Sequence, residues 1–203
     1  MLARRHFLAL ALAAAAPRAL AAAAPALSAQ DSATVARAVA YLEGLTTAKG
    51  RFVQTDQRGA QAGGTLYLER PGRARFEYDP PAGLVITSDG RTVTVANSRL
   101  KTFQHYPLSA TPLSLFLAQQ IRLDRGAKVT AVTPRADGFS ITASDVRGVA
   151  QGQIALSFAD DPLRLTGWTI TDAQRRVTRV DLQGLEPAGN LPIDLFVQAR
   201  PAW

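Results

Sequence analysis

Cysteine is absent from this chain of 203 residues, and histidine is scarce, with two residues. Without cysteine the chain has no disulfide, no thiolate metal ligand, no cysteine nucleophile and no N-terminal cysteine for lipid attachment. Beyond the first 30 residues the sole histidine is His105, and no carboxylate flanks it at metal-ligand spacing. We therefore expect neither a metal site nor a cofactor.

Motifs for catalysis are missing as well. No serine lies in a Gly-x-Ser-x-Gly elbow, and no glycine-rich loop has the pattern of a phosphate-binding loop. Most aspartates stand where turns favour them, at Asp79, Asp89, Asp137, Asp160, Asp161 and Asp172. We expect no catalytic residue. An esterase-like enzyme is the last alternative, and a serine within hydrogen-bond reach of His105 would revive it.

Long apolar runs are also absent, and the N-terminal one has the form of a secretion signal. Arg4-Arg5 precede an apolar run from Phe7 to Ala16, and small residues that suit cleavage follow. Pro17-Arg18 interrupt the run, so it is too short for a permanent membrane anchor. We expect residues 1–29 to be a signal peptide. The arginine pair leaves both the general secretory type and the twin-arginine type open.

Acidic residues are fewer than basic ones, 16 against 23, which gives a formal net charge of +7. A leader that ends near Ala24 removes Arg4, Arg5 and Arg18 and no acid, so the charge falls from +7 to +4. The remaining arginines are scattered along strands and turns without a nucleic-acid-binding motif. We therefore expect no nucleic acid partner.

What the sequence does contain is a series of short alternating segments separated by turn residues. Pro71-Gly72, Asp79-Pro80-Pro81 and Asp89-Gly90 are examples of these turns. Their regular spacing favours an antiparallel sheet over crossover units. The expected strands are 50–57, 64–70, 73–78, 83–88, 92–96, 100–104, 128–133, 138–144, 152–158, 163–171, 176–183 and 195–198.

Two segments are expected to be helical. The first follows a cap at Asp31 or Ser32, and its apolar stripe ends at Leu45. The second, Pro112–Gln120, follows a capping hydroxyl at Thr111 and is apolar on nearly all sides. A sheet of about a dozen antiparallel strands curls, and these helices can cover its concave face. We expect residues 30–203 to form one mainly β domain of the α+β class.

Several landmarks occur in the order in which the LolA family of periplasmic lipoprotein carriers has them. They are Gly-Arg-Phe-Val-Gln at 50–54, Gly-Thr-Leu-Tyr-Leu-Glu-Arg-Pro at 64–71, Ser-Asp-Gly at 88–90, Thr-Pro-Leu at 111–113 and Leu-Pro-Ile-Asp-Leu-Phe at 191–196. The chain after the leader thus resembles this family as far as about Pro201. The resemblance implies a strongly curved antiparallel sheet that forms an incomplete β-barrel, with a helical lid over a hydrophobic cavity.

The resemblance also implies roles for individual residues. Arg70 matches the family arginine that hydrogen-bonds to the lid and holds it closed, and the alternative for Arg70 is an ordinary surface ion pair. The lid helix is expected to include Leu113, Leu115, Phe116 and Leu117. The cavity is expected to be lined by Leu42, Phe52, Leu66, Leu68, Phe76, Tyr78 and Ile86. Core packing is the alternative for these apolar residues.

The function implied is that of a monomeric carrier in the periplasm of a Gram-negative bacterium. Its cargo would be an acylated lipoprotein, taken from an ATP-driven inner-membrane transporter and passed to an outer-membrane receptor. Thr94 and Ala96 replace aromatics common in the family, so a carrier of another lipid or glycolipid remains an alternative. A third reading is an envelope-sensing interaction module that transports nothing. A ligand-sized apolar cavity beneath the second helix would favour a carrier, and a filled interior would favour the module.

Overall fold

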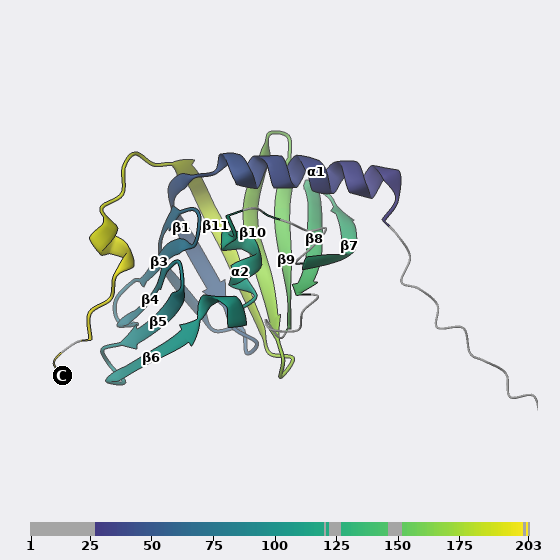
Figure 1. The fold of residues 1–203 in the computed structure, drawn as a ribbon. Coiled ribbons are helices and arrows are strands. Elements are labelled where there is room, and N and C mark those ends of the chain that lie inside the picture. The colour runs from purple at the N-terminus through teal and green to yellow at the C-terminus, as the bar shows by residue number, and fades with distance from the viewer. Residues whose placement is uncertain (1–26, 120, 122–126, 146–151, 201, 203) are drawn as a thin grey trace, which may run out of the picture.

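The computed structural model describes residues 27–119, 121, 127–145, 152–200 and 202, and within them an eleven-stranded antiparallel sheet carries two α-helices (Figure 1). The helices are α1 (Ala29–Gly44) and α2 (Leu113–Leu117), with 3-10 helices η1 (Leu108–Ala110) and η2 (Ile193–Phe196). The strands are β1 (Thr47–Thr55), β2 (Gln61–Glu69), β3 (Arg73–Tyr78), β4 (Leu84–Asp89), β5 (Thr92–Asn97), β6 (Thr102–Pro107), β7 (Ala127–Arg135), β8 (Gly138–Asp145), β9 (Gly152–Asp160), β10 (Leu163–Asp172) and β11 (Val177–Pro187). The expected signal peptide lies outside the described residues as far as residue 26. No helix in the described ranges is both long enough and apolar enough to span a bilayer.

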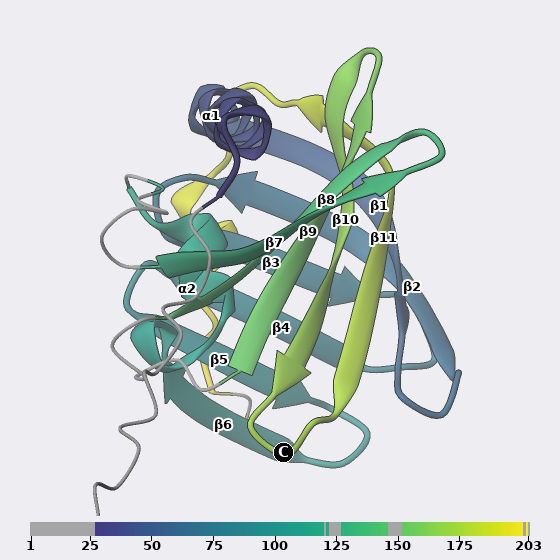
Figure 2. The ribbon, with the colours of Figure 1, turned by 90° about the vertical axis from the view of Figure 1, so that its right-hand side faces the viewer.

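Two meanders joined at the centre make up the sheet. The strand order is β6-β5-β4-β3-β2-β1-β11-β10-β9-β8-β7, so the first strand pairs with the last. The sheet curves strongly but does not close, because β6 and β7 remain as edges (Figure 2). This confirms the predicted fold class: a mainly β chain with a curved antiparallel sheet shaped as an incomplete barrel.

Bulges at glycines help to bend the sheet. The register of β1 against β11 shifts between Gly50 and Arg51, and the unpaired residue opposite the shift is Gly184, with φ of 80°. A Cβ at Gly50 would lie 1.9 Å from the carbonyl oxygen of Gly184, so no side chain fits there. Such a bulge bends and twists its strand locally, which suits the centre of a curved sheet. The glycine that opens the landmark at 50–54 is therefore needed for backbone packing.

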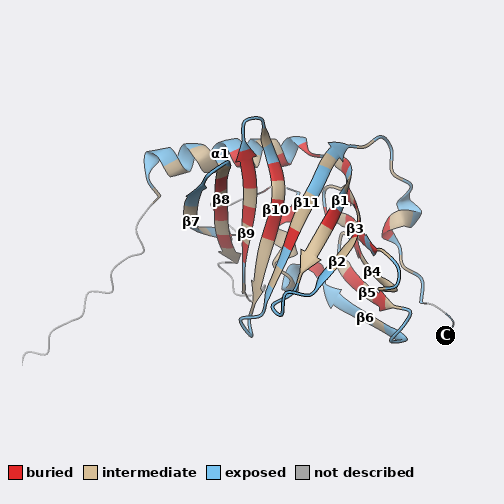
Figure 3. Ribbon diagram, turned by 180° about the vertical axis from the view of Figure 1, so that it is seen from behind, coloured by how far each residue is buried: buried red, intermediate tan, exposed pale blue. Residues whose placement is uncertain are grey.

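The concave face carries the core. Along β2 the residues Gly64, Leu66 and Leu68 are buried, and their neighbours are only partly buried, which is the period of two expected for a strand. The same alternation gives the banded colouring of the strands in Figure 3. Helix α1 lies across one end of the sheet (Figures 1 and 2) and buries Ala38 and Leu42 against it. The outer side of α1 is exposed to solvent.

The start of α1 differs from the prediction. Ser28 caps this helix: its hydroxyl oxygen accepts a hydrogen bond from the Asp31 backbone N–H at 3.0 Å and its O–H donates to the Asp31 carboxylate at 2.7 Å. The prediction of a cap at Asp31 or Ser32 was wrong. Asp31 stands three residues after the cap residue Ser28, where its carboxylate accepts a hydrogen bond from the Ser28 hydroxyl. The helix consequently begins at Ala29.

Two further segments differ from the sequence prediction. Helix α2 ends at Leu117 instead of continuing to residue 120, and the Thr111 hydroxyl donates to the Leu108 carbonyl at 2.8 Å instead of capping α2. The predicted strand 195–198 was wrong. Its first residues belong to η2, where the Leu195 N–H donates to the carbonyl of Pro192 at 3.0 Å. Phe196 anchors this segment, with its ring 5.9 Å from the Arg73 guanidinium on the convex side of β3.

Candidate functional site

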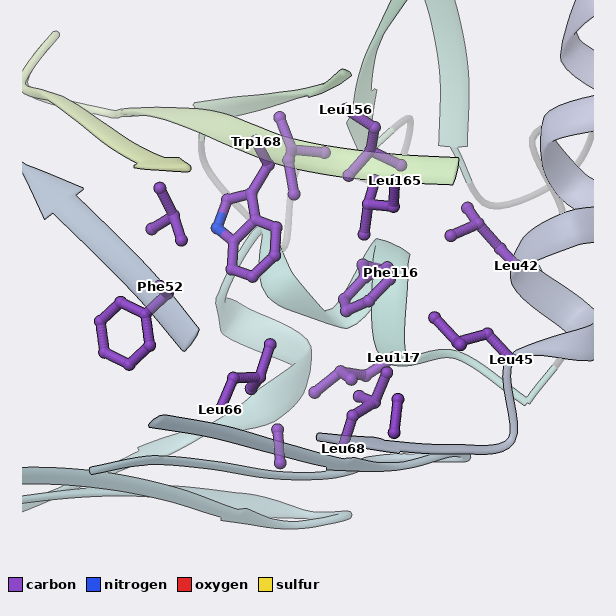
Figure 4. Close-up of a cluster of buried hydrophobic side chains, with 14 of the residues drawn as sticks. Leu42, Leu45, Phe52, Leu66, Leu68, Phe116, Leu117, Leu156, Leu165 and Trp168 are labelled. Atoms are coloured by element: carbon purple, nitrogen blue, oxygen red, sulfur yellow. The ribbon is translucent and has the colours of Figure 1, made fainter. Parts of the chain in front are cut away.

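Helix α2 fills the inside of the curved sheet. Phe116 and Leu117 are each 1% exposed. The Phe116 ring stacks on the indole of Trp168 with 5.7 Å between ring centroids. Figure 4 shows Phe116 between Trp168 and Leu165 on one side and Leu68 on the other. A five-residue helix with two fully buried side chains is held mainly by this packing, because it is too short to be stable alone.

The residues predicted to line a cavity are brought together, but as a packed core. Phe52 lies at the centre of an aromatic group, 5.6 Å from the ring of Phe76 and 5.1 Å from that of Tyr78, both in edge-to-face geometry. Leu113 and Leu115 of α2 are half-buried against the same core. Of the seven predicted cavity residues, Leu42, Phe52, Leu66, Leu68, Phe76 and Tyr78 are buried and Ile86 is half-buried. The interior around α2 is therefore occupied by the protein's own side chains.

Arg70 joins the two helices. Its guanidinium donates one hydrogen bond to the carbonyl of Leu42 in the last turn of α1 and another to the carbonyl of Ala118, at 2.7 Å, just beyond α2. The last turn of α1 has no basic residue of its own, so Arg70 supplies the positive charge that the C-terminal end of a helix favours. The backbone N–H of Arg70 is fixed by the carbonyl of Thr46 at 2.7 Å. One arginine of the sheet thus holds both helices in place.

The electrostatics of Arg70 limit the strength of this link. Burial lowers the pKa of its guanidinium, and the charge of Glu43 acts in the opposite direction. The Nε atom is buried without a hydrogen-bond partner. Arg70 stays protonated at physiological pH because an arginine does not lose its proton in proteins. The two carbonyl contacts are therefore offset in part by the cost of burying the charge.

Two tight turns support the end of α2. Gly72 follows Arg70-Pro71, has φ of 82° and donates its N–H to the carbonyl of Leu117 at 2.8 Å. The carbonyl of Gly72 accepts a bond from the hydroxyl of buried Ser88 at 2.6 Å. A Cβ at Gly72 would lie 2.6 Å from the Cα of Gly90, so the β2–β3 and β4–β5 turns touch. The two landmarks, Arg-Pro-Gly and Ser-Asp-Gly, therefore form one support under α2.

An open groove runs beside this support. Its volume is about 560 Å³, and its lining includes the turn residues Pro71, Gly72 and Gly90 and the α2 residues Ser114, Leu117 and Ala118. The groove is thus bordered by Gly72 and Leu117, whose backbone hydrogen bond supports the end of α2.

Comparison with known proteins connects this arrangement with a family. Residues 43–198 match the family model described as outer membrane lipoprotein carrier protein LolA. The chain belongs to the LolA family. An outer-membrane lipoprotein carrier protein from Chromobacterium violaceum is 29% identical over 179 residues, which cover 84% of this chain and 85% of that protein.

Solved structures with a similar fold have much lower identity. A DUF1329 family protein from Desulfovibrio piger has a TM-score of 0.50 at 12% identity, over 81% of this chain and 95% of that one. A LolA superfamily protein from Nitrosomonas europaea has a TM-score of 0.45 at 13% identity, over 85% of this chain and 99% of that one. At such identities the similarity concerns the fold alone.

The described contacts of His105 are with Thr94 and Phe103 and not with a serine. Its Nδ1 lies 3.0 Å from the hydroxyl of Thr94 on the adjacent strand, and its ring is edge-to-face with Phe103 at 4.8 Å. No serine in the described part of this LolA-family chain is hydrogen-bonded to His105. The condition set for an esterase-like reading is therefore not met by these residues.

Sequence reasoning missed three residues that this LolA-family site depends on. Trp168, the platform for Phe116, is 3% exposed and lies on the inward face of β10. As one of two tryptophans, in a predicted alternating strand, it could have been proposed as a core residue. Gly72 was predicted only as a turn residue, and Ser88 only as the end of a strand before the Asp-Gly turn. Nothing in their local pattern indicates that they contact one another.

Proposed function

We propose that this chain carries acylated lipoproteins through the periplasm and binds their acyl chains inside the half-barrel once α2 has moved aside. The observation that supports this most directly is the double contact of Arg70 with the carbonyls of Leu42 and Ala118. A single side chain of the β2–β3 turn links α1 to the end of the helix that occupies the interior, in addition to the packing of that helix. Such a link can be broken without unfolding the sheet.

The energetics fit a carrier that must release what it binds. Moving α2 aside exposes Phe116 and Leu117, whose burial stabilises the closed state by about 1.5–3 kcal/mol each. A long acyl chain in their place contributes on the order of 10 kcal/mol gross. Closure of α2 then competes with the cargo for the same space, which keeps binding reversible.

The remaining steps follow the family. The N-terminal 29 residues would direct export to the periplasm of a Gram-negative bacterium, and residues 30–203 would form a single monomeric domain. An ATP-driven inner-membrane transporter would supply the lipoprotein, and an outer-membrane receptor would accept it. Family membership and the carrier from Chromobacterium violaceum support this route. In this proposal the chain has no enzymatic step.

A second candidate function rests on the filled interior. Because the core side chains and α2 occupy the inside of the sheet, the same half-barrel can serve as an interaction module that transports nothing. The two candidates differ in one property: only the carrier admits an acyl chain beneath α2.

Fluorescence of Trp168 distinguishes the candidates. Replacing the other tryptophan, as Trp203→Phe, leaves Trp168 as the single tryptophan, which can be excited selectively over the tyrosines. Addition of a synthetic diacylated lipopeptide should change its emission saturably, because Phe116 leaves the indole face, and the same peptide without acyl chains should have no effect. Unchanged emission together with lipopeptide that elutes unbound in gel filtration would contradict the carrier and favour the module. Native mass spectrometry of protein from the host periplasm would then identify the cargo.

A further inference from the structure

The two edges of the open sheet differ in how they are protected. Natural sheets blunt their edges with charges, prolines and bulges. Strand β7 has all three: Lys128 and Arg135, Pro134, and a register shift between Val129 and Ala131. Strand β6 reads Thr-Phe-Gln-His-Tyr-Pro, carries no charge, and pairs with β5 without a bulge. Strand β7 thus combines charges, a proline and a bulge, whereas β6 has a proline only at its last position, Pro107.

The backbone of β6 offers hydrogen-bonding groups on its free side. The N–H of Leu108 donates to the carbonyl of Arg91 at 2.7 Å, which fixes the phase of bonding between β5 and β6. Because bonded and non-bonded pairs alternate in an antiparallel ladder, the N–H and C=O groups of Phe103 and His105 point away from β5. No residue of the described chain binds these outward groups. Figure 3 shows β6 at the border of the sheet, and all its residues except half-buried Phe103 are exposed.

Basic residues stand at both ends of this edge. Lys101 directly precedes β6, and Arg91 lies opposite Leu108 just beyond its other end. Both are exposed, and neither forms an ion pair with a described residue. Arg99 adds a third positive charge in the β5–β6 turn. A strand laid along β6 would therefore have cations near both of its ends.

We propose that β6 is a docking edge for an extended acidic segment of a partner protein, which adds to the sheet as a further antiparallel or parallel strand. Backbone bonds to Phe103 and His105 supply the register, and Lys101 and Arg91 select acidic sequences. A second copy of this chain is disfavoured as the occupant, because pairing β6 with β6 would bring these cations together. The inference goes beyond the carrier role, since it involves neither α2 nor the interior.

The test uses the purified protein and a nine-residue peptide with capped ends, in which glutamate alternates with valine and threonine. We expect saturable binding, with the amide signals of Phe103 and His105 protected from hydrogen exchange in the complex. The same peptide with lysine in place of glutamate should not bind. Raising the salt from 0.05 to about 0.5 M should weaken the complex, because exposed charges are screened.

Two variants separate backbone pairing from charge. His105→Pro removes one outward N–H and leaves the bonds to β5, and proline is tolerated at an edge whose N–H faces solvent. It should weaken binding by about fivefold or more. Arg91→Glu with Lys101→Glu should weaken it by about tenfold or more. Lys128→Glu on β7 is the matched control and should leave the affinity unchanged.

Several results would overturn the proposal. One is that the lysine peptide binds as strongly as the acidic peptide, or that neither binds. Another is that the amides of β7 are protected from exchange and those of β6 are not. A third is a dimer in sedimentation that is lost in the His105→Pro variant. If His105→Pro fails to fold, the charge-reversal pair and the exchange data still decide the matter. Acyl-chain binding measured by Trp168 should be unchanged in the charge variants, so this inference and the carrier proposal fail separately.

Discussion

Replacement of Arg70 by leucine removes the link between the two helices and keeps the apolar part of the side chain. The guanidinium loses its hydrogen bonds to the carbonyls of Leu42 and Ala118, and those carbonyls lose their partner. The contact between the Gly72 N–H and the Leu117 carbonyl remains. We expect α2 to leave the interior more often while the sheet stays folded.

The size of the effect follows from the contacts. Two hydrogen bonds from a charged donor contribute about 1.5–3 kcal/mol each. Leucine also removes the cost of burying the charge and its unpaired Nε, which offsets part of that loss. A net loss of about 1–3 kcal/mol for the closed state remains, which corresponds to an open population about 5- to 150-fold larger.

Hydrogen exchange of peptides that contain residues 108–118, followed by mass spectrometry, measures this opening. Exchange there should accelerate by that factor, and exchange in β9 and β10 should stay unchanged. Arg51→Leu is the matched control, because Arg51 forms an exposed ion pair with Asp79 away from α2. In a transfer assay the Arg70→Leu variant should retain cargo, because closure no longer competes with it. Unaltered exchange around α2 together with normal hand-off to a receptor would refute the reasoning.

Three further predictions concern stability. Gly72→Ala should lower the free energy of unfolding in urea by about 1–3 kcal/mol more than Gly59→Ala does. Both glycines have φ of 82°, but only at Gly72 would a Cβ meet Gly90, at 2.6 Å, and equal losses would disprove the contact between the turns. Burial raises the pKa of Tyr78 to about 12, so the wild type should lose stability as the pH rises from 10 to 12. In Tyr78→Phe this part of the loss should be absent when the urea midpoint of unfolding is measured against pH. Parallel curves for the two proteins would contradict this. Phe196→Ala should cost about 3 kcal/mol and open the C-terminal segment to limited proteolysis, and cleavage no faster than in the wild type would show that this ring does not anchor it.

Strands and turns were predictable because their causes are local. Alternation of apolar residues and the turn chemistry of Pro-Gly and Asp-Gly act within a few residues, and the predicted strands from 50 to 183 are found with small shifts at their ends. The segment 195–198 failed because Phe196 is fixed by packing on β3, which outweighs its strand propensity. Helix α2 ends at Leu117 because the backbone of Ala118 is extended, with ψ of 146°, and the carbonyls of Leu117 and Ala118 are bonded by Gly72 and Arg70 of the β2–β3 turn.

The site was predictable only in part. The role of Arg70 came from the resemblance to a family, and the structure places its guanidinium between the two helices. The stack of Phe116 on Trp168 joins residues from α2 and β10, and no local pattern indicates such a pair. The same holds for the contact of Gly72 with Gly90, since two separate turns meet there. Long-range packing of this kind depends on the curvature of the whole sheet.

Because β1 pairs with β11, the sheet can be completed only after the last strand has been synthesised. We expect the contacts between the first and last strands to form late, because closing so long a loop costs entropy. Until β11 has been made, the meander β1–β6 has a second unpaired edge at β1, and open edges favour aggregation. A chain that crosses the inner membrane unfolded must be protected in this state on the far side, whereas a chain exported in folded form completes the pairing in the cytoplasm. For the export proposed above, the type of leader would therefore decide in which compartment the sheet becomes complete.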